Sequence, residues 1–193
     1  MDSTEPGEEV FTAEGAEQRK RIRITLHESA IAMQRDRLEL GDEASATDEV
    51  LAARVAALGF EGDATQVVDL LPLVHVAWSD GTIQKGERAA IIGLLRVRGI
   101  PVGKAYQVML ALLEERPSDE YLEESLKVLR ELIERGGSVK AQTIVGLCIM
   151  VAEAAGGFLG LTNPISKDER AAIEHIAMRL GDSAMQEFQR RLG

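Results

Sequence analysis

Apolar residues recur three and four positions apart along most of the chain. The clearest run is Leu122, Leu126, Leu129 and Ile133, a spacing that places four large side chains on one face of a helix. No segment alternates apolar and polar residues over six positions, so the pattern does not favour half-buried strands. We therefore expect an all-α protein. Its helices are predicted at about 16–40, 47–58, 64–79, 84–98, 101–115, 118–135, 138–154, 166–181 and 182–192.

The helix expected over residues 64–79 is apolar on nearly every side. A helix without a polar face is buried, so this one should lie at the centre of the fold. Pro72 falls inside it. Because proline lacks a backbone N–H and clashes with the preceding turn, Pro72 should either kink the helix or mark its true start.

Two parts of the chain resemble each other. The sequence Glu-Arg-Ala-Ala-Ile occurs at 87–91 and again at 169–173, and each copy follows an apolar helix and a glycine-bearing turn. The leading helices align at an offset of 75 residues and the trailing ones at 82, so the second turn is seven residues longer. These observations predict a compact helical bundle with an internal duplication of a helix–turn–helix unit, with repeat 1 at about 64–98 and repeat 2 at about 138–181.

The beginning of the chain differs in composition from the rest. Residues 1–15 are rich in acidic residues and glycine and offer little to bury, which predicts a disordered acidic tail. Residues 16–45 should form an Arg-rich amphipathic helical extension. The helical domain proper is expected over 46–193.

The net charge of −10 limits the classes of partner. An acidic surface repels phosphates, so we expect no nucleic-acid binding. The absence of any apolar run of about 20 residues predicts no membrane insertion. The single cysteine, Cys148, lies in an apolar stretch and is expected to be buried and inert. With no signal sequence at the N-terminus, a cytoplasmic location is expected.

The first turn carries the most informative motif. Residues 80–87 read Asp-Gly-Thr-Ile-Gln-Lys-Gly-Glu, which matches the second half of an EF-hand calcium loop. The first and third ligand positions of such a loop would fall on Val76 and Trp78, which cannot coordinate. This turn is therefore at most a half-loop that needs oxygen ligands from elsewhere.

The second repeat offers those oxygens if the two turns meet. The candidate metal ligands are the acidic residues of both turns, Asp80, Glu87, Glu153, Asp168 and Glu169. Clustered carboxylates repel one another unless a proton or a cation intervenes, and a hard ion such as Ca²⁺ or Mg²⁺ suits an all-oxygen set. The alternative is purely structural, because Ser166 and Glu169 have the spacing of a helix capping box.

No other motif indicates chemistry. The three histidines are scattered and the motif contains no Cys or His, so a zinc site is not favoured. No nucleophile with a base and no phosphate-binding glycine loop is visible. We therefore expect a protein that is not an enzyme.

At these residues the chain resembles the tellurite-resistance TerB-like family. The likeness covers residues 60–181 and rests on 77–83 with 87–88, and on 151–153 with 165–170. It implies a helical bundle with an internal repeat, in a cytoplasmic bacterial protein tied to metal or chemical stress. It also implies a metal-binding role for the acidic residues of the turns, which here are Asp80, Glu87, Glu153 and Glu169.

A metal-assisted hydrolase that uses the same carboxylates is disfavoured, because no nucleophile or poised base is visible, and two functions are favoured by the sequence. One is a non-enzymatic module that binds a divalent cation, a protein partner, or both, through the duplicated acidic turns. The other is a structural or adaptor protein that self-associates or docks through the Arg-rich helix. In either case we expect a protein partner or a homo-oligomer.

Overall fold

The computed structural model describes residues 48–60, 67–135, 140–155 and 165–193. These residues form α-helices and, within the described ranges, no strands. The helices are α2 (Asp48–Ala57), α3 (Leu71–Ala77), α4 (Lys85–Val97), α5 (Lys104–Glu114), α6 (Asp119–Glu134), α7 (Ala141–Ala155), α8 (Lys167–Leu180) and α9 (Asp182–Leu192). The all-α class is thus confirmed, and the bounds of most helices agree closely with the sequence pattern.

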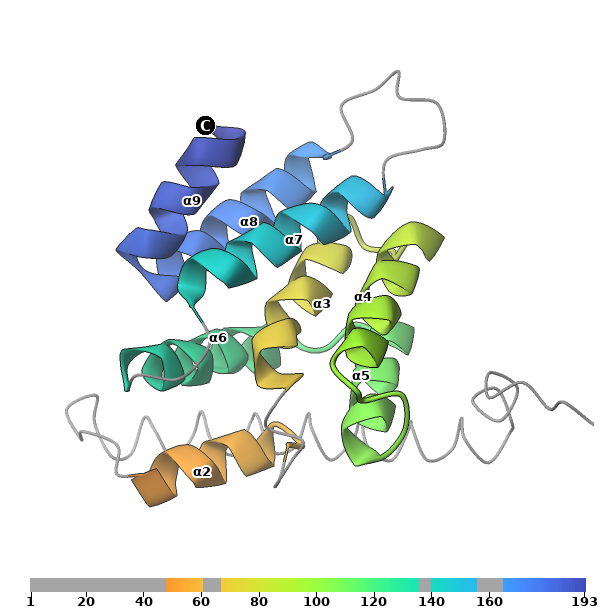
Figure 1. Ribbon diagram of the computed structural model, residues 1–193, viewed down its shortest axis with the longest axis vertical. Helices are drawn as coiled ribbons and strands as arrows, with labels where there is room; N and C mark the ends of the chain where they lie inside the picture. The colour runs from red at the N-terminus through yellow and green to blue at the C-terminus, as the bar shows by residue number, and fades with distance from the viewer. Residues whose placement is uncertain (1–47, 61–66, 136–139, 156–164) are drawn as a thin grey trace, which may run out of the picture.

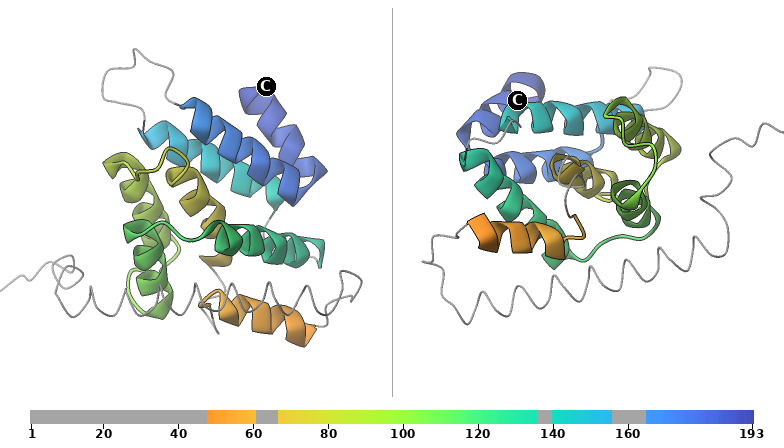
Figure 2. Two further views of the ribbon diagram at one scale, coloured as in Figure 1. Left: turned by 180° about the vertical axis from the view of Figure 1, so that it is seen from behind. Right: turned by 60° about the horizontal axis from the view of Figure 1, so that its bottom comes forward.

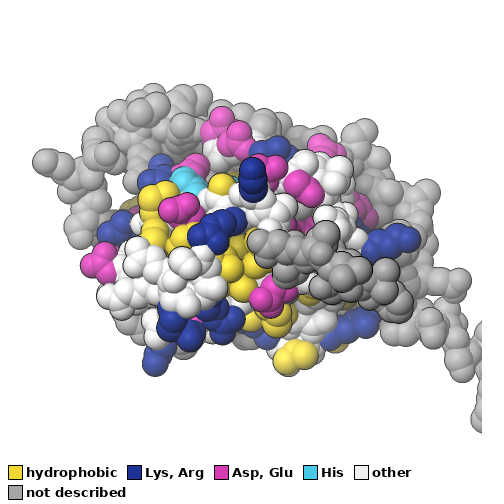
Figure 3. All heavy atoms as spheres, turned by 90° about the horizontal axis from the view of Figure 1, so that it is seen from above, with side chains coloured by type: hydrophobic (Ala, Val, Ile, Leu, Met, Phe, Trp, Pro, Cys, Tyr) yellow, Lys and Arg dark blue, Asp and Glu magenta, His cyan; other side chains and the backbone are white. Residues whose placement is uncertain are grey.

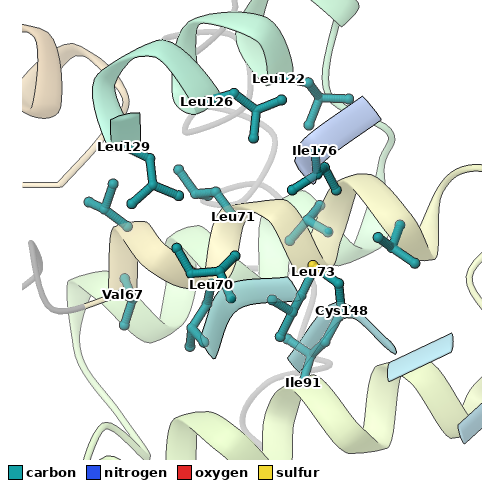
Figure 4. Close-up of a cluster of buried hydrophobic side chains, with 14 of the residues drawn as sticks. Val67, Leu70, Leu71, Leu73, Ile91, Leu122, Leu126, Leu129, Cys148 and Ile176 are labelled. Carbon is teal, nitrogen blue, oxygen red and sulfur yellow. The ribbon is translucent and has the colours of Figure 1, made fainter. Parts of the chain in front are cut away.

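Helix α3 lies at the centre of the bundle and packs against α4, α6, α7 and α8 (Figure 1). Its side chains Leu71, Leu73, Val74 and Val76 are all buried. In Figure 4, leucines of α6 lie on one side of α3, and Ile91 of α4 and Cys148 of α7 lie on the other. An apolar helix with no polar face can be accommodated only in such a place.

The start of α3 differs from the simplest expectation. Residues 67–70 form a 3₁₀ turn, and the α-helix begins at Leu71 with Pro72 in its first turn. Proline fits there because the first N–H groups of a helix have no intrahelical acceptor in any case. Of the two outcomes expected for Pro72, the structure shows the second, a true helix start.

Some of the described helix ends carry the capping serine or the terminal glycine that the sequence indicates. Ser118 caps α6, its side chain accepting from the N–H of Tyr121 at 3.2 Å. Gly59 and Gly181 have positive φ angles where α2 and α8 end, a conformation that glycine adopts without strain.

The two helix–turn–helix units face the same end of the molecule. Helices α3 and α7 finish there, and α4 and α8 begin there, in the views from the front and from behind (Figures 1 and 2). Helix α7 packs against α3, α4 and α8, so the two units share one interface. The common origin of the units stays a prediction from the sequence.

Several sequence expectations lie outside the described residues. They are the acidic tail at 1–15, the Arg-rich extension at 16–45, the start of the 46–193 domain, and the enlarged part of the second turn.

Candidate functional site: two acidic elbows

The first elbow, residues 78–87, connects α3 to α4. The carboxylate of Asp80 accepts a hydrogen bond from the N–H of Thr82 at 3.0 Å, and Gly81 has a φ of +92°. One Glu87 carboxylate oxygen accepts from the N–H of Gln84, the residue before α4, at 2.7 Å. Glu87 therefore folds back over the start of its own helix, as a residue at the third helical position does in a capping box.

The first elbow is also tied to α5. The indole N–H of Trp78 donates to the carbonyl of Leu112 at 2.8 Å, and Arg88 donates to the carbonyl of Leu113 at 3.1 Å. These carbonyls belong to the last turn of α5, where backbone oxygens lack helical partners. The elbow thereby satisfies the end of α5 and is held in place by it.

The second elbow connects α7 to α8, and its described part, residues 165–169, contains a complete capping box at the start of α8. The Ser166 hydroxyl accepts from the N–H of Glu169 at 3.1 Å, and a Glu169 carboxylate oxygen accepts from the N–H of Ser166 at 2.6 Å. The capping role weighed for this pair is thus observed. It uses one oxygen of Glu169 and leaves the other, Oε1, for a second partner.

Glu87 and Glu169, the glutamate pair, meet between the two elbows. The charge of Glu169 and a side-chain interaction with it both raise the pKa of Glu87, so the two carboxyl groups lie close together, and the residues are only 2% and 3% exposed. The two residues occupy the same position in the repeated Glu-Arg-Ala-Ala-Ile sequence. The structure thus brings together two of the five predicted metal ligands, one from each elbow.

The electrostatics of the pair follow from this contact. Burial, helped by the negative charges of Glu169 and Asp80, raises the pKa of Glu87 to about 7, and the hydrogen bond from Gln84 opposes the shift. Two carboxylates this close cannot both stay charged without a cost in energy. Glu87 therefore carries a proton over much of the range in which an isolated glutamate would be ionised.

The second carboxylate oxygen of Glu169 is the unsatisfied acceptor of the site. Oε1 is buried and has no hydrogen-bond donor among the described residues. A buried acceptor without a partner is costly. Two species can satisfy it: a proton on Glu87, which turns that carboxyl into a donor, or a cation shared by both carboxylates.

The other predicted ligands occupy different environments. Asp80 is exposed but acts on Glu87 through its charge, so it lies beside the pair. Glu153, near the end of α7, and Asp168, in the first turn of α8, are both exposed to solvent. The site proper is therefore the glutamate pair with Asp80 next to it.

The donor set is small. Among the described residues, no group of three or more His, Cys, Asp or Glu side chains is arranged to hold a metal ion. Any ion at the glutamate pair must complete its coordination with water.

A second polar cluster was not predicted from the sequence. The rings of His75 on α3 and His175 on α8 lie 5.9 Å apart. His175 Nε2 is 2.6 Å from a carboxylate oxygen of Glu123 on α6, and Arg179 is bonded to the other oxygen. We call these four residues the histidine cluster. The sequence predicts isolated histidines, because 100 residues separate His75 from His175.

The surface of the described residues is mixed in charge. Seen from above, acidic and basic side chains are interspersed and a histidine reaches the surface among them (Figure 3). Within the described ranges, no helix has the length and apolar character needed to cross a bilayer.

Comparison of the chain with family models, characterised proteins and solved structures finds no match. The TerB-like resemblance therefore rests on the sequence motifs alone. A fold can host many activities, so function has to be argued from the chemistry of the site.

Proposed function

We propose that this protein is a non-enzymatic binding module whose two acidic elbows together take up a hard divalent cation. The observation that carries the proposal is the buried glutamate pair, in which Glu169 Oε1 has no donor among the described residues. A cation between the carboxylates would satisfy that oxygen and remove their mutual repulsion. Asp80, beside the pair, adds negative charge that favours the ion.

The small donor set favours Mg²⁺ over Ca²⁺. Mg²⁺ keeps several of its waters and is commonly held by one or two carboxylates, whereas Ca²⁺ takes six to eight oxygen ligands. Two buried carboxylates with a third nearby match the first description. Binding should be weak, with a dissociation constant on the order of 1 mM, because so few protein ligands contribute.

The cation competes with a proton for the same place. Burial and the neighbouring charges raise the pKa of Glu87 to about 7, so an ion that needs the carboxylate must displace that proton. Metal sites with titratable ligands release protons on binding. Affinity should therefore be higher at pH 8 than at pH 6.

The resemblance of both elbows to the TerB-like family supports a biological setting for this module. That setting is the response to metal or chemical stress, in which a protein that responds to ion and proton levels has an evident use. Tellurite itself is an anion and does not fit a pair of carboxylates, so the proposed ligand is the cation.

Calorimetric titration of the metal-free chain with Mg²⁺, Ca²⁺ and Mn²⁺ tests the proposal. We expect one site per chain at pH 8 and at least a tenfold loss of affinity in Glu87→Gln and in Glu169→Gln. Glu153→Gln and Asp168→Asn are matched controls, because each removes one exposed carboxylate near the elbows. Asp80→Asn should have an intermediate effect, since Asp80 acts through its charge.

Two results would reject the cation proposal. One is the absence of binding heat at millimolar metal and pH 8. The other is unchanged binding in the Glu87→Gln/Glu169→Gln double variant, which would place any ion elsewhere on this acidic chain.

The adaptor role remains a second candidate, supported by exposed apolar residues. Val97, the last residue of α4, and Val102, within the connection from α4 to α5, are 86% and 71% exposed. Apolar side chains grouped at a surface often mark a protein contact.

Light scattering tests self-association in this candidate role. We expect more chains per particle for the full chain than for a chain lacking residues 1–45 if the Arg-rich segment links copies. Equal stoichiometry in the two chains would exclude self-association through that segment.

A further inference from the structure

The histidine cluster lies where three helices meet. His75 comes from α3, His175 and Arg179 from α8, and Glu123 from α6, and these three helices pack pairwise against one another. On α8, His175 is six residues beyond Glu169, which corresponds to about 9 Å along the helix axis. The cluster is therefore distinct from the glutamate pair.

The spacing of the two imidazoles suits a shared metal ion. A Zn–N bond to histidine is about 2.0–2.1 Å and the nitrogen lies roughly 1 Å from the ring centre, so two rings on one ion have centres about 5–6 Å apart. The observed separation is 5.9 Å, with an angle of 62° between the ring planes. Because rotation about the Cβ–Cγ bond of histidine has broad minima, small ring movements can aim both nitrogens at one point.

One nitrogen of His75 has no other use in the structure. Its Nδ1 is buried and lacks a hydrogen-bond partner among the described residues. A buried polar atom without a partner in a native protein calls for an explanation, and an absent ion is one of the standard explanations.

Glu123 orients the second histidine. Its carboxylate accepts from His175 Nε2 and is itself held by Arg179. When the proton of His175 is on Nε2, Nδ1 carries the lone pair that a metal needs. Ligating histidines almost always donate their other N–H to a carboxylate, carbonyl or water in this way.

From this geometry we propose that His75 and His175 bind a borderline-soft divalent ion of the Zn²⁺ class, with Glu123 orienting His175 and water completing the coordination. Imidazole nitrogen favours Zn²⁺, Cu²⁺ and Ni²⁺ over Mg²⁺ and Ca²⁺. The site is thus chemically separate from the elbows, which offer only oxygen. Because the protein supplies only two ligands, the site keeps open coordination positions and is not a closed structural zinc site.

The protonation state of His75 supports this assignment. Burial, together with the neighbouring His175, lowers the pKa of His75 to about 4, while Glu123 and Asp119 act in the opposite direction. The imidazole of His75 is therefore neutral at neutral pH, which is the form that binds metal.

Zinc titration of the full chain tests the proposal. The titration is run at pH 7.5 with 10-fold excess Mg²⁺ over zinc, monitored by competition with a chromophoric chelator. We expect one zinc per chain, at least a tenfold loss of affinity in His75→Gln and in His175→Gln, and a smaller loss in Glu123→Gln. The matched control is His27→Gln, which removes the third histidine of the chain and should leave affinity unchanged.

Each result decides the matter. Wild-type affinity in both His75→Gln and His175→Gln, or loss in His27→Gln alone, overturns the proposal, as does the absence of zinc binding. Far-ultraviolet circular dichroism establishes that each variant is folded. Zinc binding that persists in Glu87→Gln/Glu169→Gln, with Mg²⁺ binding abolished, separates this site from the elbow site, so that either proposal can fail alone.

Discussion

Replacement of Glu87 with glutamine is expected to make the protein more stable at pH 8 and to leave its stability nearly unchanged at pH 4.5. The gain at pH 8 should be about 1–3 kcal/mol, a range that allows for solvent screening of the charges. Glutamine has the shape of a protonated glutamate. It can accept the N–H of Gln84 and donate to Glu169 Oε1, the oxygen that otherwise has no donor among the described residues.

The direction of this effect follows from proton linkage. Burial raises the pKa of Glu87 from 4.5 to about 7 in the folded protein, so the folded state binds a proton more tightly than the unfolded state. Such a group contributes stability that is fully present below pH 4.5 and is lost as the pH rises through 7. Glutamine does not titrate, so the variant keeps at pH 8 what the wild type has lost.

Urea unfolding of both proteins at several pH values, with a chelator present to remove metal ions, measures the effect. Glu174→Gln is the matched control, because Glu174 is an exposed residue of α8 and its replacement removes the same charge. A control that gains as much stability as Glu87→Gln would mean that net charge, and not the glutamate pair, is responsible. A difference that does not change between pH 4.5 and pH 8 would contradict the shared-proton interpretation.

The titration of His75 also changes the stability of the wild type with pH, so the effect of Glu87 has to be measured as the difference between wild type and Glu87→Gln. Burial lowers the pKa of His75 from 6.5 to about 4, so the unfolded state binds that proton more tightly. This group destabilises the fold as the pH falls through 6.5, opposite to the effect of Glu87. The two effects partly cancel in the wild type, whereas the difference between wild type and Glu87→Gln isolates Glu87.

Much of the fold and half of the site could be predicted from local sequence. Helix ends are set by nearby residues, and Ser118, Ser166 and Gly59 mark theirs by side-chain capping or by a positive φ angle. The glutamate pair could be predicted because the repeat placed Glu87 and Glu169 at equivalent positions. Equivalent positions in packed repeats tend to meet, and a residue that caps its own helix is held near the backbone.

The burial of each acidic residue could not be predicted in the same way. Asp168 and Glu169 are neighbours in the sequence, yet the first is exposed and the second is buried. The capping position turns Glu169 inward over the helix start, whereas the preceding position faces solvent. From charge and sequence proximity alone, Glu153 and Asp168 are predicted to be metal ligands just as Glu87 and Glu169 are.

No local sequence pattern predicts the histidine cluster. His75 and His175 meet because α3 packs against α8, and that contact depends on the whole bundle. The available signal was indirect: His75 lies in an otherwise apolar helix, where a polar side chain needs a partner. Only the tertiary arrangement identifies that partner.

Truncation of Leu73 to alanine is expected to cost about 2–5 kcal/mol, the range for a large-to-small change in a well-packed core. Leu73 is 0% exposed, and in Figure 4 it points toward Cys148 of α7 and Ile91 of α4. The cavity would therefore lie between the two helix–turn–helix units. Val97→Ala is the control, because Val97 is 86% exposed and its truncation should change stability by less than about 0.5 kcal/mol.

The same experiment tests whether the two units unfold together. Trp78 is the only tryptophan and stands at the end of α3, bonded to α5, so its fluorescence reports the first elbow. Circular dichroism reports all helices, including those of the second unit. Because α3 packs against α4, α6, α7 and α8, the two signals should follow one transition in the wild type and in Leu73→Ala. An earlier fluorescence transition would mean that the first elbow unfolds before the rest of the bundle. That result would contradict the view that the two units together hold Glu87 and Glu169 close to each other.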